Sequence, residues 1–223
     1  MTKVDLKIVL LGQQHVGKSC LVDRFLNSKF DAMQKNTIGA AFGAKRVYLP
    51  NGRGMTLGIW DTAGAERFES LSRVYYHSAG SALVCFDPTK MDTWQKLDFW
   101  VGELQENEPR CKIYLVETKH DLLEMGETRV VSAEEVAEYA QRINAHLFRT
   151  SAKSGYNVVE LFVGVARDAD KEMSVLKPNP STVNVKAVDR EGNKYVALVL
   201  LSRLSCSLGG CWRRGGGGLE MII

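Results

Sequence analysis

The fold of this 223-residue chain is decided by one stretch near its start, "LKIVLLGQQHVGKS" at residues 6–19. Its first six residues are mostly apolar and have the length of a buried β-strand. The next eight follow the pattern Gly-x-x-x-x-Gly-Lys-Ser, in which backbone N–H groups surround phosphates just before a helix begins. Strand, glycine-containing loop and helix therefore follow one another in the order that a phosphate-binding loop requires.

The residue types in this loop indicate how phosphates would be held. Lys18 can place its ammonium group on the β- and γ-phosphates, and the Ser19 hydroxyl can bind Mg²⁺. Contacts to the nucleotide are expected from Gly12, Gln14, His15, Val16, Gly17, Lys18, Ser19 and Cys20. The loop alone leaves the class of protein open, because kinases, ATPases and GTPases share it.

Further strand-like and helix-like segments alternate along the chain. Strands are expected at 6–11, 44–49, 55–60, 81–86, 112–117 and 146–150, and helices at about 17–27, 67–78, 92–106, 132–145 and 156–173. This alternation favours an α/β fold with a mostly parallel sheet covered by helices on both faces. A Pro-Asn-Gly turn joins the second and third strands as a hairpin, which adds one antiparallel edge strand. Ser132 and Glu135 fit a capping box at the start of the fourth helix.

Composition and charge exclude several classes of protein. Hydrophobic residues make up 45% and charged residues 25% of the chain, which is the balance of a globular protein. The formal net charge of +3 is too small to indicate a nucleic-acid partner. Five scattered cysteines form no disulfide or metal pattern, and the N-terminus has no signal-peptide cleavage site, so we expect a cytoplasmic protein. The apolar run "YVALVLL" at 195–201 is far too short to span a bilayer.

Two short motifs at predicted strand ends point to a guanine nucleotide with a metal ion. In "DTAG" at 61–64, Asp61 can hold Mg²⁺ through a water, and Gly64 lets the backbone approach a γ-phosphate. In "TKHD" at 118–121, the carboxylate of Asp121 can accept from the N1–H and N2–H₂ donors of guanine. Adenine lacks that pair of donors, so the choice of base follows from the acceptor geometry.

A third motif, "TSAK" at 150–153, follows the last predicted strand and can offer the Ala152 N–H to the oxygen of guanine. The stem of Lys119 can lie along the plane of the base. Each of these short motifs is weak alone, but their occurrence at strand ends in this order is specific. Contacts to the base are therefore expected from Thr118, Lys119, Asp121, Ser151, Ala152 and Lys153.

With these motifs the chain resembles the Rab family of Ras-like small GTPases, over residues 5 to about 175. Other pieces similar to that family are "IGAAF" at 38–42, "TLGIW" at 56–60, "RFES" at 67–70, "YYHSA" at 75–79 and "LVCFDPT" at 83–89. The resemblance implies the α/β fold of a P-loop NTPase, with a six-stranded, mostly parallel sheet and five helices, which binds GTP or GDP with Mg²⁺. It also implies two switch segments, 31–43 and 62–78, that contact effector, exchange-factor and activating proteins.

Two more site residues rest on the same resemblance. Thr37 matches the threonine that binds Mg²⁺ and the γ-phosphate in the triphosphate form. The metal is therefore expected on Ser19, Thr37 and, through water, Asp61, and catalysis on Lys18, Thr37, Gly64 and the residue at position 65. Phe30 matches the aromatic residue that packs beside the base, although without the family match core packing is equally expected for it.

Three positions depart from the pattern of the family. The residue after "DTAG" is normally a Gln that orients the attacking water, and here it is Ala65, whose side chain cannot hydrogen-bond. Gln14 replaces a small residue beside the γ-phosphate, where an arginine finger would need room. Thr118 replaces Asn, so the sequence predicts the loss of a tie between the guanine motif and the phosphate loop. Together these departures resemble a divergent Rab subgroup, and the first two predict slow GTP hydrolysis.

The chain changes character after about residue 175. Residues 1–175 are expected to form the GTPase domain, and residues 176–223, with seven Lys or Arg and three Asp or Glu, an irregular, flexible or atypical tail without a fold of its own. The alternative is an extra strand over 195–201. The last four residues contain no Cys, so no terminal prenylation motif is expected. Two alternatives remain for the tail: it associates with a membrane through palmitoylation of Cys206 or Cys211, or it is unanchored. We favour the unanchored tail, because a single lipid chain anchors a protein only weakly.

The sequence favours a guanine-nucleotide-dependent switch in intracellular membrane or vesicle traffic that recruits effectors, with peripheral attachment to endomembranes left open. The alternative from a different class is a P-loop metabolic phosphotransferase. That enzyme would need an acceptor pocket and lid arginines, and the sequence shows no such cluster. Co-purifying GDP or GTP would favour the switch, whereas phosphoryl transfer to a small acceptor would favour the transferase.

Overall fold

The computed structural model describes residues 3–64, 74–176, 183–188, 194–199, 211–215 and 218–222. The chain divides into two compact units, residues 1–171 and residues 172–223. The first unit contains the sheet that the sequence predicts, and the second contains short hairpins.

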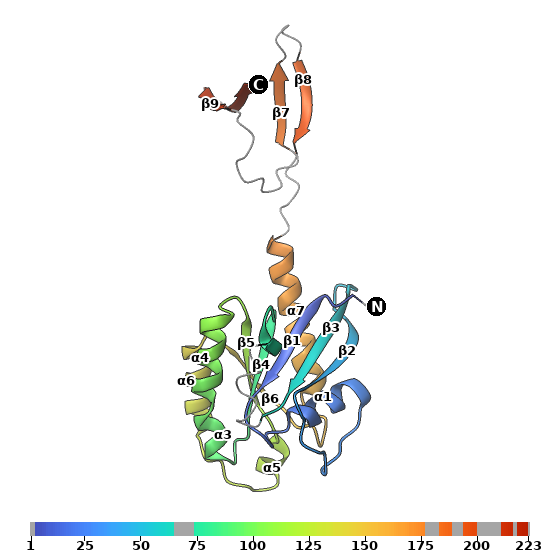
Figure 1. Ribbon diagram of the computed structural model, residues 1–223, viewed down its shortest axis with the longest axis vertical. Coiled ribbons are helices and arrows are strands. Elements are labelled where there is room, and N and C mark those ends of the chain that lie inside the picture. The colour runs from blue at the N-terminus through green and yellow to red at the C-terminus, as the bar shows by residue number, and fades with distance from the viewer. Residues whose placement is uncertain are drawn as a thin grey trace. The chain divides into compact units, whose positions relative to one another are not determined.

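The first unit is built on a six-stranded sheet (Figure 1). Its strands are β1 Leu6–Leu11, β2 Ala40–Tyr48, β3 Gly54–Thr62, β4 Ser81–Phe86, β5 Lys112–Glu117 and β6 His146–Arg149. Their order in space is β2-β3-β1-β4-β5-β6, and within this sheet only the edge strand β2 pairs antiparallel. The predicted six-stranded, mostly parallel sheet with one antiparallel edge strand is therefore confirmed.

The strand order places β1 between β3 and β4, in the interior of the sheet. From β1 the later strands are added first on one side and then on the other, so the loop after β1 lies where the direction of connection changes. In open α/β sheets, ligand sites form at the carboxyl ends of the strands beside such a switch point. The phosphate-binding loop directly follows β1 and so occupies this position.

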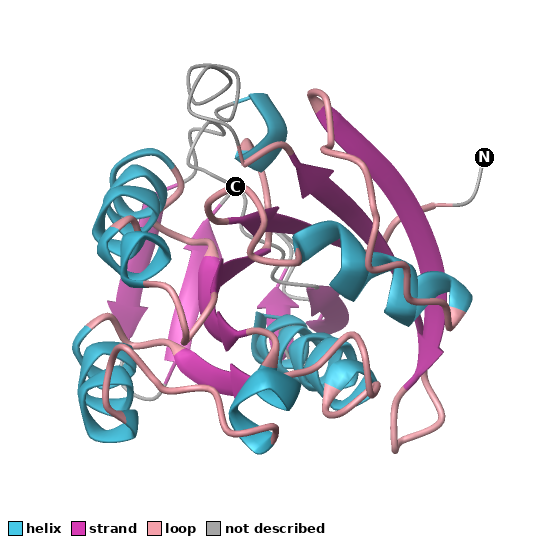
Figure 2. Ribbon diagram, turned by 90° about the horizontal axis from the view of Figure 1, so that it is seen from below, coloured by secondary structure: helices cyan, strands magenta, loops and turns pink. Residues whose placement is uncertain are grey.

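Helices cover both faces of the sheet, as Figure 2 shows. They include α1 Lys18–Asn27, α3 Met91–Gln95, α4 Leu97–Asn107, α5 His120–Glu124, α6 Ala133–Arg142 and α7 Val158–Leu176. On one face α1 and α7 meet through the stacked rings of Phe25 and Phe162, whose centroids are 4.0 Å apart. The start of α6 is the capping box that the sequence predicts, because the Glu135 N–H donates to Ser132 Oγ at 3.0 Å.

Two helical segments differ from the prediction, and a third lies partly outside the described residues. The helix expected over 92–106 is divided at Lys96 into α3 and α4, although Lys96 keeps dihedrals of −78° and −9°, so the break is local. The five-residue α5 was not predicted, because one turn is too short to show a helical period. Of the helix expected over 67–78, residues 74–76 are helical, and residues 65–73 lie outside the described residues.

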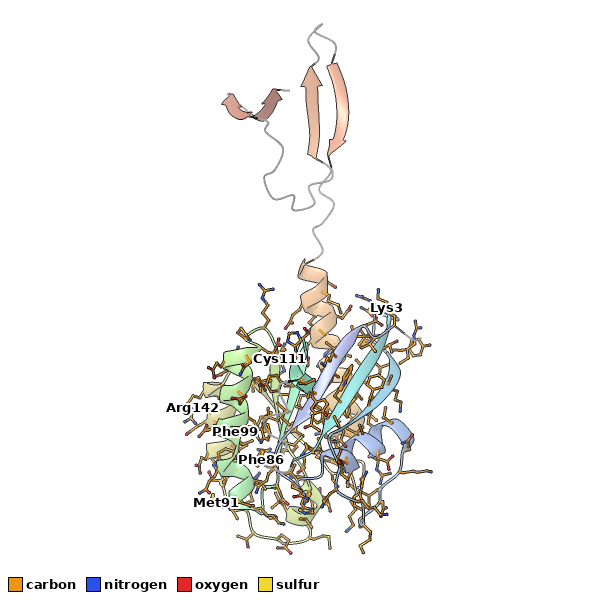
Figure 3. The ribbon with its side chains drawn as sticks, viewed as in Figure 1. Lys3, Phe86, Met91, Phe99, Cys111 and Arg142 are labelled. Carbon is orange, nitrogen blue, oxygen red and sulfur yellow. The ribbon has the colours of Figure 1, made fainter. Side chains whose placement is uncertain are left out.

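The core between the sheet and the helices α4 and α6 is formed by the apolar runs of the sequence. β1 and β4 are buried along nearly their whole length, since interior strands of a parallel sheet are covered on both faces. Trp100 of α4 and Val136 of α6 pack in one cluster with Val9 of β1. Figure 3 labels Phe86 and Cys111 of this cluster toward opposite ends of the sheet. Burial of a large apolar side chain contributes roughly 1.5–3 kcal/mol, and this packing holds the strands whose ends carry the site.

In the second unit the structure describes two antiparallel hairpins. One pairs β7 Val183–Val188 with β8 Lys194–Val199, and the other pairs β9 Cys211–Gly215 with β10 Gly218–Ile222. The sequence favours a tail without a fold of its own, with a strand over 195–201 as the alternative. The strand β8 corresponds to that alternative, and the alternating valines of "VNVKAV" favour the extended partner β7.

No helix among the described residues combines the length and the apolar character that a membrane span requires.

Candidate nucleotide-binding site

A cavity of about 440 Å³ opens at the carboxyl ends of the parallel strands. Its wall is formed by the loop after β1, the start of α1, the segment before β2, the end of β3 and the loops after β5 and β6. Of the predicted site residues, the wall contains Gln14, His15, Gly17, Lys18, Ser19, Cys20, Phe30, Thr37, Gly64, Thr118, Lys119, Asp121, Ala152 and Lys153. The tertiary structure thus brings segments from distant parts of the sequence into one cavity.

Four other predicted residues lie behind the wall and support it. The carbonyl groups of Gly12 and Val16 accept hydrogen bonds from side chains in the wall. Asp61 and Ser151 are hydrogen-bonded to side chains in the wall. The remaining predicted residue, Ala65, lies outside the described residues.

The path of the phosphate loop requires glycine at both of its ends. Gly12 has φ +137°, and a Cβ atom there would lie 2.3 Å from the carbonyl oxygen of Cys85. Gly17 has φ +98° and stands at the N-cap of α1, which has no side-chain cap. The first N–H groups of α1 therefore lack a side-chain partner at the cap and can receive an anion.

Lys18 lies inside the loop with only 5% of its surface exposed. Its Nζ donates to the carbonyl oxygens of Gly12 at 2.7 Å and Gln13 at 3.0 Å. Burial lowers the pKa of Lys18, while the nearby Cys85 and Asp61 oppose that shift. An ammonium group has three donors, so a phosphate oxygen can occupy the third while the loop carbonyls keep two.

Ser19, Thr37 and Asp61 come from three different segments and meet at one point. The hydroxyl oxygens of Ser19 and Thr37 are 2.8 Å apart, and the Thr37 hydroxyl donates to Asp61 Oδ2 at 3.3 Å. Burial raises the pKa of Asp61, and Ser19, Lys18 and Thr37 partly offset this rise. The segment before β2 is thus joined through Thr37 to α1 and to the end of β3.

The donor set of these three residues fits Mg²⁺. Asp61 is 4% exposed, and its Oδ1 atom has no hydrogen-bond partner. A buried carboxylate oxygen without a partner is costly unless a cation or a water serves it. Carboxylate and hydroxyl oxygens are ligands that Mg²⁺ accepts. In the described part of the chain no group of three or more His, Cys, Asp or Glu is arranged to hold a metal ion.

At the opposite end of the cavity, the predicted base-recognition motifs meet. Ser151 Oγ donates to Asp121 Oδ1 at 2.5 Å, which holds the carboxylate in place. Lys119 has a left-handed backbone, with φ 53°, and its Nζ lies 2.8 Å from Asp87 Oδ2. Burial alone would raise the pKa of Asp87, but hydrogen bonds from Lys119 and Thr89 outweigh burial and lower that pKa.

Phe30 lies in the wall of the cavity and is 37% exposed. The structure therefore does not place this side chain in the core, which was the other placement expected from sequence. An aromatic ring at the edge of a cavity can cover one face of a base.

The expectation for Thr118 is wrong. Thr118 Oγ1 donates to the carbonyl oxygen of Val16 at 2.6 Å and also lies 2.9 Å from the carbonyl oxygen of Phe86. The guanine motif and the phosphate loop are therefore tied together despite the replacement of Asn. The hydroxyl group can make these contacts because Thr118 is 3% exposed and the backbones of the two loops lie close enough together for a short side chain to reach both.

Gly64 and Gln14 are neighbours across the cavity wall. A Cβ atom at Gly64 would lie 2.4 Å from the backbone nitrogen of Gln14, so only glycine permits this approach of the second switch segment to the phosphate loop. Both residues line the cavity, as the sequence analysis expected of them.

Sequence reasoning missed Arg24 as a support of the base-recognition loop. Its Nε donates to the carbonyl oxygen of Ala152 at 2.5 Å and its Nη2 to that of Lys153 at 2.7 Å. No local pattern could reveal it, because the partners lie 128 and 129 residues apart in sequence. Other wall residues missed from sequence are Leu21, Ala32, Gln34, Lys35, Asn36, Ile38, Thr62, Leu122 and Thr150.

A phosphate loop after β1, paired oxygen donors beside it and an acidic residue at the far end of the cavity define the class of P-loop nucleotide-binding proteins. Comparison with known proteins supplies the family: a family model described as "Ras family" matches residues 7–171. The chain therefore belongs to the Ras family.

Relatives narrow this assignment to the Rab branch. The chain is 44% identical over 186 residues to "Ras-related protein Rab-24" of Dictyostelium discoideum, a match that covers 82% of this chain and 91% of that protein. It is 37% identical over 188 residues to "Ras-related protein RABF2b" of Arabidopsis thaliana, with coverage of 84% and 92%. It is 40% identical over 163 residues to "Ras-related protein Rab-31" of Homo sapiens, with coverage of 73% and 82%. The protein is a Rab-like small GTPase of membrane traffic, which binds GTP and GDP and hydrolyses GTP.

Proposed function

We propose that this Rab-like GTPase is a slowly hydrolysing switch that binds GTP or GDP with Mg²⁺ and recruits effectors through residues 31–43 and 62–78. The observation that carries the proposal is the meeting of Ser19, Thr37 and Asp61. Through it a residue of the first switch segment reaches the phosphate end of the cavity.

Each end of the nucleotide would be held by groups of known chemistry. Lys18 and the free N–H groups of α1 bind the phosphates. The carboxylate of Asp121 accepts from the guanine edge while Ser151 keeps it oriented, and the Ala152 N–H donates to the guanine oxygen. When bound on Ser19 and Thr37, Mg²⁺ neutralises part of the phosphate charge.

The switching element would be the segment around Thr37. Loss of the γ-phosphate and of the metal contact would remove two of the interactions that hold the Thr37 hydroxyl group beside Ser19 in the triphosphate form. The next residue, Ile38, is 81% exposed, and Phe42 is 58% exposed. Because these exposed apolar side chains adjoin the Thr37–Ser19 contact, they are suited to binding a partner protein in only one nucleotide state.

Slow hydrolysis follows from two residues: Ala65, which lacks a water-orienting group, and Gln14, which adds bulk beside the phosphates. Phosphoryl transfer depends on positioning the attacking water and on stabilising charge. Lys18 supplies charge, but Ala65 has no side-chain group that could hold a water. Gln14 lies in the cavity wall near the phosphate loop, where an activating protein would insert an arginine.

We place its action in the cytoplasm, with peripheral attachment to endomembranes as the expectation for a Rab-like protein. In this tail, Cys206 and Cys211 are the candidate positions for a lipid. Acyl exchange on the purified cellular protein tests this, and absence of a thioester-linked lipid supports the unanchored tail.

The direct test of the proposed function is the identity of the nucleotide that co-purifies with the protein. Denaturation followed by ion-exchange chromatography should release GDP or GTP in nearly equimolar amount. Release of adenine nucleotides, or transfer of phosphate from a nucleotide to a small acceptor, would support the metabolic phosphotransferase instead.

A further inference from the structure

A fully buried carboxylate beside the base-recognition loops belongs to Glu117, a residue with no role in the nucleotide contacts described above. Glu117 is the last residue of β5, and its side chain is fully buried. It does not line the cavity. A carboxylate removed from water is costly unless cations and hydrogen bonds compensate it.

Basic side chains from three segments surround this carboxylate. Arg129 directs both terminal nitrogens at Glu117 Oε2, Nη1 at 3.0 Å and Nη2 in still closer contact. His120 Nδ1 lies 3.3 Å and Arg149 Nε 3.9 Å from Oε1. A fork of two N–H groups on one carboxylate is directional, so it fixes orientation as well as charge.

Two of the three partners lie in or next to the motifs that frame the base. His120 lies between Lys119 and Asp121 in the guanine motif. Arg149 immediately precedes "TSAK" at 150–153. One buried carboxyl group is therefore paired with a residue of the guanine motif, with the residue that precedes "TSAK" and, through Arg129, with the loop that follows α5.

Backbone hydrogen bonds join the same segments around Glu117. Its carbonyl oxygen accepts from the Thr150 N–H at 2.8 Å and from the Thr150 hydroxyl at 3.2 Å. The His120 N–H donates to the Thr150 carbonyl at 3.0 Å, and the His120 ring stacks on Tyr156, with centroids 5.4 Å apart. The side-chain cluster of Glu117 thus reinforces the joint between the ends of β5 and β6.

We propose that Glu117, oriented by Arg129, is a positioning residue that holds "TKHD" and "TSAK" at the spacing guanine requires, and so sets nucleotide residence time and base discrimination. The inference rests on the proposed guanine-nucleotide function. Asp121 and Ser151 are already 2.5 Å apart, so a small displacement between the two segments changes the acceptor that reads the base. Glu117 acts through these loops and touches no ligand.

The test measures release of a fluorescent GDP analogue from the full chain after addition of excess unlabelled GDP. Glu117→Gln keeps the shape and removes the charge, and it should speed release about tenfold or more. Because the effect lies at the base, the fold-increase should be the same with Mg²⁺ and with EDTA. Ser19→Ala is the contrasting variant: it should speed release with Mg²⁺ present, and it should have no effect on release once EDTA has removed the metal.

A second readout separates positioning from general destabilisation. Inosine diphosphate lacks the 2-amino group that Asp121 reads, so the affinity ratio of GDP to inosine diphosphate reports the geometry of that carboxylate. Glu117→Gln should lower this ratio. The matched control is Asp170→Asn, which weakens the pairing of the buried Asp170 with the half-exposed Arg53 outside the cavity. It should lower the melting temperature but leave release and the ratio unchanged.

Arg129 provides a variant series if Glu117→Gln does not fold. Arg129→Lys keeps the charge but loses the fork, so it should show an intermediate effect, and Arg129→Met should show the full one. The double variant Glu117→Gln with Arg129→Met should not exceed the larger single effect. Unchanged release, an unchanged ratio or additive effects would overturn the positioning role. Equal binding of GDP and ADP by the unmodified protein would instead refute the proposed function itself.

Discussion

The hydroxyl oxygen of Thr118 lies 2.6 Å from the carbonyl oxygen of Val16, a residue 102 positions earlier in the chain. This hydrogen bond joins the base end of the cavity to the phosphate loop. The Thr118 hydroxyl group has one proton to donate, and the carbonyl oxygen of Phe86 is a second acceptor for it at 2.9 Å. The two ends of the nucleotide site are therefore mechanically coupled through one short side chain.

Removing that hydroxyl should loosen the site. Thr118→Val preserves shape but removes the donor to the Val16 carbonyl, at a cost of roughly 1–3 kcal/mol. The Phe86 carbonyl keeps the Thr118 N–H as a donor at 2.9 Å. We expect faster GDP release, with Thr118→Ser close to the unmodified protein. Because the tie is already present, Thr118→Asn should not slow release appreciably, contrary to the expectation from sequence. Stopped-flow release of a fluorescent GDP analogue measures all three, and unchanged release by Thr118→Val would show the bond to be dispensable.

Base preference should follow the carboxylate of Asp121. Asp121→Asn replaces one acceptor oxygen by a donor, which suits the 2-oxygen of xanthine and opposes the 2-amino group of guanine. Competition binding with GDP and xanthosine diphosphate should show the preference reversed. Ser151→Ala, which removes the hydrogen bond at 2.5 Å, should weaken GDP binding without creating a xanthine preference. Tight GDP binding by Asp121→Asn would contradict the assigned contact.

Hydrolysis should rise when the missing water-orienting group is supplied. Ala65→Gln should raise the single-turnover rate by about tenfold or more, since each tenfold step corresponds to about 1.4 kcal/mol of barrier. Adding Gln14→Gly should raise it further, chiefly with an activating protein present. Quench-flow assay of labelled GTP measures both rates. An unmodified protein as fast as a Rab that carries the Gln would defeat this explanation.

Cysteine reactivity should report both burial and occupancy of the cavity. Burial raises the pKa of Cys85 and of Cys111 to about 12, and it raises the pKa of Cys20, which lines the cavity. Below its pKa a thiol gains thiolate roughly tenfold per pH unit, so iodoacetamide labelling of Cys20 should rise from pH 7 to 9. Bound GDP should suppress it. Peptide mass spectrometry distinguishes the sites, and prompt labelling of Cys85 in folded protein would disprove its burial.

Local patterns sufficed for the framework of the molecule. The runs 6–11, 81–86 and 112–117 coincide with β1, β4 and β5, because continuous apolar stretches bounded by loops are typical of interior strands. The hairpin was predictable from its Pro-Asn-Gly turn, and the start of α6 from its capping box. Short elements such as α5 were not predictable, since a helix of about one turn is too short to show a helical period in its sequence.

The site was predictable in its residues but not in its contacts. Motif spacing indicated Lys18 and Asp121, because phosphates and guanine demand particular donors and acceptors at strand ends, and the family resemblance indicated Thr37. Only the tertiary structure decided that Thr118 keeps its tie to the phosphate loop and that Glu117 is paired with arginines. The physical reason is distance along the chain: sequence patterns specify the local backbone, whereas contacts between residues a hundred positions apart depend on how the strands and helices pack.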